Sequence, residues 1–437
     1  MEVISIHDRI IGKRKETHVG HLMLFLLILT GALLLRLSFS VYAGNTYDMN
    51  INEGWMKSAL ELGIGHSFGE QVDGNMLPNH LPLEIFLYGL SGMTYQSLVS
   101  MDDFSIQPSF RIFTKLPAIL FDLVACIGLF FLVQKMKSTG AGLLAAVLYA
   151  IQPVVWYESA VWGQTDGIYS ALFLLCITML AYQKVGWASA FLALAILHKP
   201  QALVLIPLLL FFFPRSLKSA LSLLVGGGLA ALYVLFPFYR AGTAFRAIDL
   251  WWEALFRATN FKLSRGAFTF WDAIIGNRAF ELSGSDMILW GITYRMVGTS
   301  LVLCAYLLVF YAMFRHRNKV LSIEVQCAAC ALISLAFFLF ATGVHDRYLF
   351  PFVLFGLPLS FRDRRGFVLY MSIALLFFVN IFWVLPITPA AGSFLYKNFP
   401  LLHVTIATLQ VVLCGCYFHY FFTLNSERVP VLDSKRR

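Results

Sequence analysis

The stretch HLMLFLLILTGALLLRLSFSV, residues 21–41, is apolar over the length that one helix needs to cross a bilayer. Arg9 and the basic triplet at 13–15 precede it. A basic start followed by an apolar middle also resembles a signal peptide. Because many further apolar runs follow, we expect an uncleaved first transmembrane helix.

Composition extends this expectation to the whole chain. Of its 437 residues, 59% are hydrophobic and 13% are charged, which is more apolar surface than a soluble domain of this size can bury. The net charge of +9 comes mostly from short basic clusters between apolar runs. Orientation among membrane lipids explains such clusters better than a nucleic-acid partner, and we expect no nucleic-acid binding.

The predicted fold is an all-α polytopic membrane protein of about twelve helices. Residues 186–214 stand apart, because their two apolar arms are each too short to cross alone and meet at polar residues 198–201. We expect a short helical hairpin there, buried against protein. The other predicted spans are 21–41, 111–134, 140–158, 166–183, 217–239, 287–314, 320–341, 348–361, 366–386 and 401–423.

Basic residues give the expected orientation, because alternate loops carry Lys and Arg as cytoplasmic loops do. Both termini, 1–20 and 424–437, are then cytoplasmic tails of one membrane-embedded domain spanning 1–437, in a bacterial inner or plasma membrane. The two longest loops, 42–107 and 240–286, lie on the extracytoplasmic side. Chemistry is therefore expected on that face.

The first outer loop begins with NTYDMNINEGW, residues 45–55. If residues 48–60 are helical, Asp48, Asn52 and Trp55 share one face. A carboxylate, an amide and an indole so placed suit a sugar, with Asp48 as a general base. The alternative is that Asp48 only caps the helix, which is the commoner role for an Asp at that place.

A second polar cluster follows at residues 158–169, in a short outer turn between two predicted spans. Trp162, Gln164 and Asp166 are candidates for binding the sugar or the acceptor, although Asp166 could simply cap a helix. Lys199, at the tip of the predicted hairpin, suits an anionic phosphate.

Charged residues also fall inside predicted spans. We expect Arg36 to extend toward the outer interface. Asp122, near the middle of its span, is expected to form a structural ion pair with Lys115 or another cation.

Two later stretches could bind phosphate or sugar. His345 and Arg347, in the stretch TGVHDRYLFP at 342–351, offer phosphate donors. The loop 240–286 is basic and aromatic, and its Trp271 is a candidate for sugar stacking or for an interfacial position. No outer-loop spacing of His or carboxylates resembles a ligand set, so we expect neither a metal nor another cofactor.

Together these motifs resemble the polytopic GT-C glycosyltransferases. The resemblance rests on an Asp in the first outer loop, then the motif at 162–166, Lys199-Pro200-Gln201, the stretch 268–271 and the motif at 345–351. It is similar in particular to bacterial mannosyltransferase-like proteins related to the enzyme that adds the second mannose of glycosylphosphatidylinositol anchors.

The resemblance implies a polyprenyl- or dolichyl-phosphate-linked sugar donor, used on the extracytoplasmic side with inversion. Asp48 matches the family's catalytic base, and His345 and Arg347 match its carrier-phosphate pattern. Two positions depart from the family. His80-Leu81-Pro82 stands where Tyr-Pro-Pro is common, and Thr269 stands where Asn is common. Both departures leave the sugar and the acceptor open.

The expected reaction is one displacement that transfers a hexose, with mannose as the candidate, to a glycan, lipid or protein acceptor. Asp48 takes the acceptor proton, and the lipid phosphate leaves as an anion that needs charge stabilisation but no protonation. Two alternatives are a transporter or flippase of a lipid-linked sugar and a ligase or polymerase of surface polysaccharide. A transporter is disfavoured because the chain has no repeated half with matching interrupted helices.

Overall fold

The computed structural model describes residues 2–72, 76–99, 108–213, 216–256, 262–315, 321–387, 399 and 401–426. These residues form two compact units. The first unit comprises the described residues within Met1–Leu203, Phe213–Thr259 and Phe377–Phe394, and the second those within Val204–Phe212, Asn260–Leu376 and Leu395–Arg437. The single domain stays a prediction, and each unit is described by itself below.

The predicted all-α polytopic architecture is confirmed, since helices dominate both units. Seven helices are long and apolar enough to cross a membrane among the described residues. They are Val19–Ser40, Pro108–Met136, Leu217–Arg240, Tyr294–Arg315, Ile323–Phe340, Arg364–Val384 and Leu402–Leu424. Because shorter apolar helices would also have to cross, the count of about twelve stays a prediction.

The first unit contains most of the chain's first half. Its long helices are α1 (Glu2–Ser40), α4 (Pro108–Met136) and α10 (Leu217–Arg240), joined by α5 (Thr139–Ile151), α7 (Asp166–Ala181) and α8 (Val185–His198). The described residues of the predicted outer loop 42–107 fold into α2 (Thr46–Glu61), η1 (Ile64–His66) and α3 (Pro82–Leu98), and α11 (Ala244–Phe256) follows α10.

The predicted span 140–158 is not one straight helix. α5 ends before Pro153, and the chain turns by 49° into α6 (Pro153–Trp156) and the π-helical turn η2 (Tyr157–Trp162). Proline cannot donate to the preceding turn, which explains the break. A π turn leaves backbone groups outside the regular helix pattern and is frequent at functional sites.

The hairpin at 186–214 stays a prediction, because its second arm lies mostly in the second unit, but both arms are helical. α8 ends at His198, and the chain continues after Lys199 as a 3₁₀ segment, η3 (Pro200–Leu208), and a short turn, α9 (Leu209–Phe212). Pro200 ends α8 because the residue before a proline is driven out of the helical region. Both arms are helical and short, as expected from their length.

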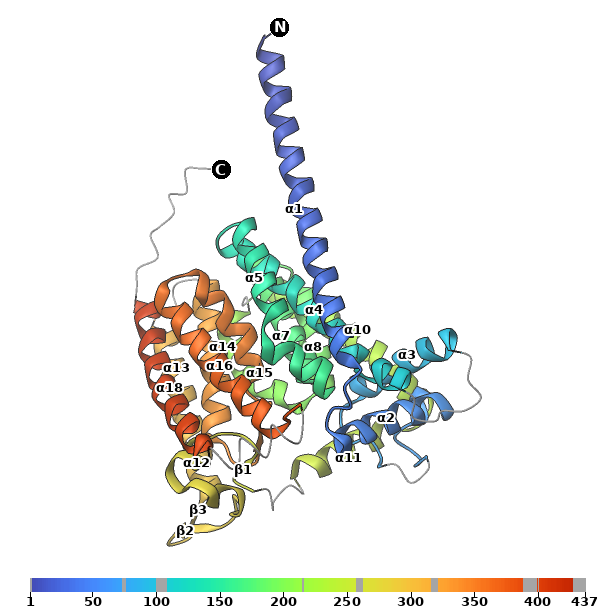
Figure 1. Ribbon diagram of the computed structural model, residues 1–437, viewed down its shortest axis with the longest axis vertical. Helices are drawn as coiled ribbons and strands as arrows, with labels where there is room; N and C mark the ends of the chain where they lie inside the picture. Colours follow the sequence, from blue (N-terminus) through green and yellow to red (C-terminus); the bar gives the residue numbers. More distant parts are fainter. Residues whose placement is uncertain are drawn as a thin grey trace. The chain divides into compact units, whose positions relative to one another are not determined.

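The second unit is a helical bundle with a small irregular region at one end. α13 (Tyr294–Arg315) and α18 (Leu402–Ser426) both pack against α14 (Ile323–Phe340). The chain continues from α14 through α15 (Phe350–Gly356) and η6 (Leu357–Phe361) into α16 (Arg364–Val384), and Figure 1 shows these helices as one bundle. α16 belongs to this unit up to Leu376. The irregular region holds β1 (Ser264–Arg265), α12 (Phe270–Ile275), η5 (Gly276–Phe280), β2 (Met287–Leu289), β3 (Ile292–Thr293) and β4 (Val344–His345).

The predicted span 287–314 is wrong at its start. Residues 287–293 form the antiparallel pair β2–β3, and the helix begins only at Tyr294. Trp290 and Gly291 both have positive φ, 45° and 82°, as a two-residue hairpin turn requires. The helix therefore begins seven residues later than the predicted span.

Each unit packs around one helix that is apolar on every side. Every residue of α7 from Asp166 to Thr178 is buried, and α14 is buried nearly throughout. A helix without a polar face belongs in the centre of a bundle. The start of α7 is therefore fixed by its surroundings, which matters for the polar residues beside it.

Candidate active site

The site begins where α1 ends and α2 starts. Asn45 is the N-cap of α2, and its side-chain oxygen accepts hydrogen bonds from the backbone N–H groups of Tyr47 and Asp48. Asp48 therefore does not cap the helix. The capping alternative for Asp48 is wrong, because Asn45 already fills that role.

Asp48 is instead held by the polar turn that follows η2. Its Oδ2 accepts hydrogen bonds from the indole Nε1 of Trp162 at 2.9 Å and from the amide Nε2 of Gln164 at 2.8 Å. No residue that the structure describes donates to the other oxygen, Oδ1. The half-buried carboxylate is thus fixed through one oxygen and keeps lone pairs on the other.

Two glycines let these segments approach one another. Gly44 and Gly163 have φ of +70° and +86°, which L side chains rarely adopt. A Cβ at Gly44 would lie 2.5 Å from the carbonyl oxygen of Trp162, and one at Gly163 would lie 2.5 Å from the sulfur of Met49. A side chain at either position would therefore separate α2 from the turn that holds Asp48.

Lys115, in α4, binds both the end of α1 and η2 next to this site. Its Nζ donates to the carbonyl oxygens of Ser40 and Tyr42, at the end of α1, and of Ala160 and Val161 in η2, at 2.7–3.2 Å. Four carbonyls around one buried ammonium satisfy groups that the helix ends leave without partners. The suggested pairing of Lys115 with Asp122 is therefore wrong.

Asp122 pairs with Arg36. The two side chains are buried, 2.6 Å apart from Nε to Oδ2, and the Arg36 guanidinium also donates to the carbonyls of Ala32 and Ala150. Asp122 accepts further bonds from Ser159 and Tyr149. The structural ion pair predicted for Asp122 is confirmed, whereas the predicted extension of Arg36 to the interface is wrong because a buried acid binds it.

Asn52 and Trp55 continue the face of α2 that carries Asp48. Asn52 Nδ2 lies 3.4 Å from the carbonyl oxygen of Gly163, and Trp55 Nε1 donates to the carbonyl of Met76 at 2.9 Å. Trp55 also packs against His80, with ring centroids 4.8 Å apart. The shared face is confirmed, but both side chains are buried, so direct contact with a sugar would require them to move.

A second polar network lies beside the first. Thr165 donates to Glu84 Oε1 at 2.7 Å, and Glu84 Oε2 lies 2.5 Å from His80 Nδ1. Burial by itself would raise the pKa of the Glu84 carboxyl, but nearby His80, Lys199 and His198 outweigh it and hold that pKa well below its usual range. The i,i+4 spacing of His80 and Glu84 was the signal available in the sequence.

Lys199 and Asp166 bind each other in this network. Lys199 Nζ lies 3.0 Å from Asp166 Oδ2, and both side chains are buried. This ion pair joins the start of α7 to the residue after α8. A phosphate on Lys199, or a sugar on Asp166, would have to displace that bridge.

His345 and Arg347 lie in the second unit. β4 pairs in parallel with β1, which sets His345 opposite Arg265, and Arg265 Nη1 lies 3.4 Å from His345 Nε2. Arg347 Nη1 lies 4.0 Å from Asp346 Oδ1 and is mostly buried. Arg265 is a residue beside His345 that sequence reasoning did not single out as a site residue.

Trp271 is a core residue of the second unit. Its indole Nε1 donates to the carbonyl of Phe340 at 3.2 Å, and its ring packs edge-on against Tyr294. Only 3% of the side chain is exposed. Sugar stacking on Trp271 therefore stays a prediction that would require repacking.

Thr269 begins α12 as its N-cap, in a reciprocal capping box with Asp272. Asp272 Oδ2 accepts from the backbone N–H and the hydroxyl of Thr269, at 2.8 and 2.7 Å. Burial raises the pKa of Asp272 to about 7, although the bonds from Thr269 oppose the rise. Among the described residues, no group of three or more His, Cys, Asp or Glu could hold a metal ion.

No family model matches the chain, and no curated protein matches it. Among solved structures it is similar to ArnT from Cupriavidus metallidurans bound to undecaprenyl phosphate, with a TM-score of 0.49 and 12% identity, over 93% of this chain and 77% of that one. It is also similar to the Archaeoglobus fulgidus oligosaccharyltransferase tethered to an acceptor peptide with the NVT sequon, with a TM-score of 0.40 and 13% identity.

This second likeness covers 92% of this chain, which spans just over half, 55%, of the archaeal oligosaccharyltransferase chain. Likenesses of this degree carry no functional argument. The function proposed next rests on the side-chain geometry around Asp48.

Proposed function

We propose that this chain is an integral membrane glycosyltransferase of the GT-C type. It moves a hexose, with mannose as the candidate, from a polyprenyl-phosphate donor to a hydroxyl of a glycan, lipid or protein acceptor. The observation that carries the proposal is the fixed carboxylate of Asp48, which is held through Oδ2 and has no partner on Oδ1 among the described residues.

This arrangement suits a general base. Two N–H donors, from Trp162 and Gln164, fix the orientation of the carboxylate, so Oδ1 needs little reorganisation to accept a proton. In the proposed step, Oδ1 takes the proton of the acceptor hydroxyl while that oxygen forms a bond to the anomeric carbon. The bond from the anomeric carbon to the phosphate oxygen breaks, and its electron pair leaves with the phosphate.

The leaving phosphate carries its own charge and needs cations instead of an acid. We propose His345 and Arg347 for this role on the motif at 345–351. Within the second unit, Arg265 Nη1 lies 3.4 Å from His345 Nε2. Arg265 is exposed and can exchange its contacts for a ligand. Lys199 is a weaker candidate for the phosphate because Asp166 already neutralises it.

The test is transfer of radiolabelled hexose from undecaprenyl phosphate to candidate acceptors by purified protein in liposomes. Asp48→Asn should lower kcat by roughly 100- to 10,000-fold, the range for loss of a positioned base, with donor binding retained. The matched control is Glu61→Gln, which removes an exposed carboxylate from the same helix, α2, and should transfer at the wild-type rate.

Near-wild-type transfer by Asp48→Asn would contradict the base assignment. Movement of labelled donor across the bilayer without a labelled acceptor would instead identify a flippase. Transfer from a pyrophosphate-linked glycan in preference to the monophosphate donor would identify a ligase or polymerase.

A further inference from the structure

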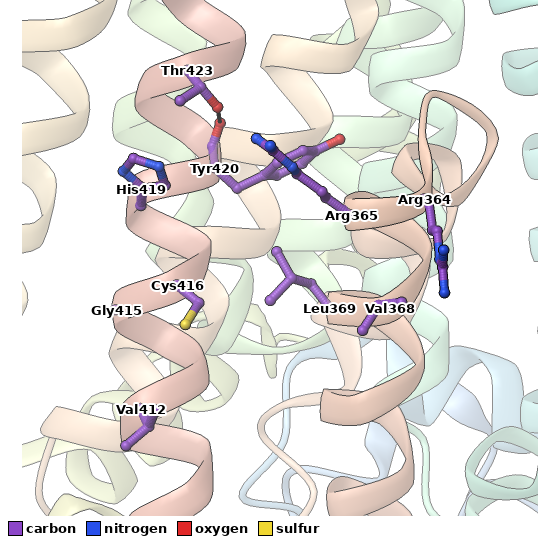
Figure 2. A pocket seen from close by; sticks show the side chains of 10 residues that line it. All are labelled: Arg364, Arg365, Val368, Leu369, Val412, Gly415, Cys416, His419, Tyr420 and Thr423. Carbon is purple, nitrogen blue, oxygen red and sulfur yellow. Dashed lines mark hydrogen bonds between the residues drawn. The ribbon is translucent and has the colours of Figure 1, made fainter.

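A groove lies between α16 and α18 in the second unit. Its volume is about 890 Å³. Its walls come from the first half of α16 and from Val412 to Thr423 of α18, as Figure 2 shows. Val368 and Leu369 line it on one side and Val412 on the other. The wall is therefore mostly apolar along its length.

Small residues keep this groove open. A Cβ at Gly415 would meet no atom within 4 Å, so the space beside it is empty of protein. Cys416, the next residue, is exposed on the same wall. Glycine inside a helix lowers helix stability by roughly 1 kcal/mol relative to alanine, so Gly415 is not there to stabilise α18.

At the end of the groove nearest Tyr420, hydrogen bonds join α16 to α18 and arginines lie nearby. Asp363 accepts from the backbone N–H of Gly366 at 2.8 Å and from the hydroxyl of Tyr420 at 3.1 Å, which ties the start of α16 to α18. Arg362 lies 3.7 Å from the same carboxylate. The negative charge of Asp363 is therefore already engaged.

Arg364 and Arg365 line the same end and are exposed. Neither forms an ion pair with any residue in the part of the chain that the structure describes. Figure 2 shows Arg365 extending from α16 toward α18. Guanidinium groups without an ion-pair partner beside an apolar groove suit an anion that carries a hydrocarbon chain.

We propose that this groove binds an anionic glycerophospholipid. Its phosphate contacts Arg365 and Arg364, and one acyl chain lies along Val368, Leu369 and Val412, past Gly415. The charge pattern of the sequence assigns this end of α16 to the cytoplasmic face, where anionic lipids are abundant and basic pockets between helices bind their headgroups. The proposal does not depend on the proposed glycosyl transfer.

The test is a titration of delipidated full-length protein with phosphatidylglycerol or phosphatidylcholine, followed by native mass spectrometry. Wild-type protein should retain phosphatidylglycerol in preference to phosphatidylcholine. Because each basic residue near the headgroups is worth roughly five-fold in affinity, the variant Arg364→Gln/Arg365→Gln should bind phosphatidylglycerol roughly 10- to 30-fold more weakly. The matched control, Lys135→Gln/Lys137→Gln, removes two cations at the end of α4 and should bind as wild type.

Gly415→Leu tests the apolar part without changing charge. Leucine fits the empty space beside α18 and favours helix, so the protein should fold while retaining much less phosphatidylglycerol. Equal losses in the Lys135/Lys137 control, unchanged retention by Gly415→Leu, or equal retention of phosphatidylcholine would each overturn the site. Tighter binding of undecaprenyl phosphate, lost on Gly415→Leu, would overturn the choice of occupant.

Discussion

Trp162 donates its indole N–H to Asp48 Oδ2 at 2.9 Å across 114 residues of sequence. Gln164 donates to the same oxygen. The segment at 45–55 and the turn at 162–166, which the sequence analysis treated as separate polar clusters, therefore form one hydrogen-bonded site. The motif at 162–164 orients the carboxylate of Asp48.

Removing one donor should weaken catalysis without removing the base. Trp162→Phe keeps an aromatic ring, smaller than the indole, but loses the N–H, and Gln164→Met keeps the length but loses the amide. Since a hydrogen bond to a charged group is worth roughly 1.5 to 3 kcal/mol, we expect kcat to fall by about 10- to 100-fold in either variant. The donor KM should stay close to wild type, because the positioning of Asp48 changes and donor binding does not.

Trp187→Phe is the control for this pair, because Trp187 is an exposed tryptophan of the same unit and its indole has no role at Asp48. A rise in KM at constant kcat in Trp162→Phe would assign the tryptophan to substrate binding instead.

The Arg36–Asp122 pair should matter for stability far more than an exposed pair. Arg36→Met leaves a buried carboxylate without its cation, which costs about 3 to 5 kcal/mol in free energy of unfolding. The double variant Arg36→Met/Asp122→Leu removes both charges and should recover much of that loss. Thermal unfolding in detergent measures both effects.

Lys57→Met is the comparison, because it breaks the partly exposed pair with Glu61, in which Nζ and Oε1 are 3.6 Å apart, and should cost no more than about 1 kcal/mol. If Arg36→Met were no less stable than Lys57→Met, the buried pair would not have the structural role assigned to it.

Asp272 should make the protein less stable as pH rises. Its folded pKa of about 7 lies above the unfolded value of about 3.9, so the folded state binds the proton more tightly. Proton binding to Asp272 therefore adds a few kcal/mol, to order of magnitude, to the free energy of unfolding below pH about 4. This contribution declines as the pH rises and is gone above pH about 7.

Asp272→Asn should lower this dependence, because the amide oxygen can still accept from Thr269 but cannot ionise. The measurement is the thermal midpoint of wild type and variant at pH 5, 6, 7 and 8. Parallel curves for the two proteins would contradict the raised pKa of Asp272.

The membrane class and most spans were predictable from the sequence, because apolar runs of bilayer length can hardly be anything else. The helix 46–61 and its polar face were also predictable, since helical spacing is local information. The β2–β3 hairpin was missed because Trp290 and Gly291 lie inside an apolar run, where composition hides the turn.

The partners of charged residues were not predictable. Asp122 could have paired with Lys115 or another cation, and only the packing of α1 against α4 decided for Arg36. Lys115 instead donates to four carbonyl oxygens, because the π turn in η2 and the end of α1 direct carbonyl groups toward its ammonium group. No local pattern encodes such contacts.

For Asp48, the sequence by itself supplied a carboxylate on a helical face after the first transmembrane run, together with a family resemblance. Tertiary structure alone decided that Asn45 caps the helix and that Trp162 and Gln164 hold Oδ2. The physical reason is the separation along the chain over which each kind of interaction acts. Hydrophobic length and helical period act within a segment, whereas hydrogen bonds between segments depend on glycine-permitted approaches such as those at Gly44 and Gly163, which exist only once the chain has folded.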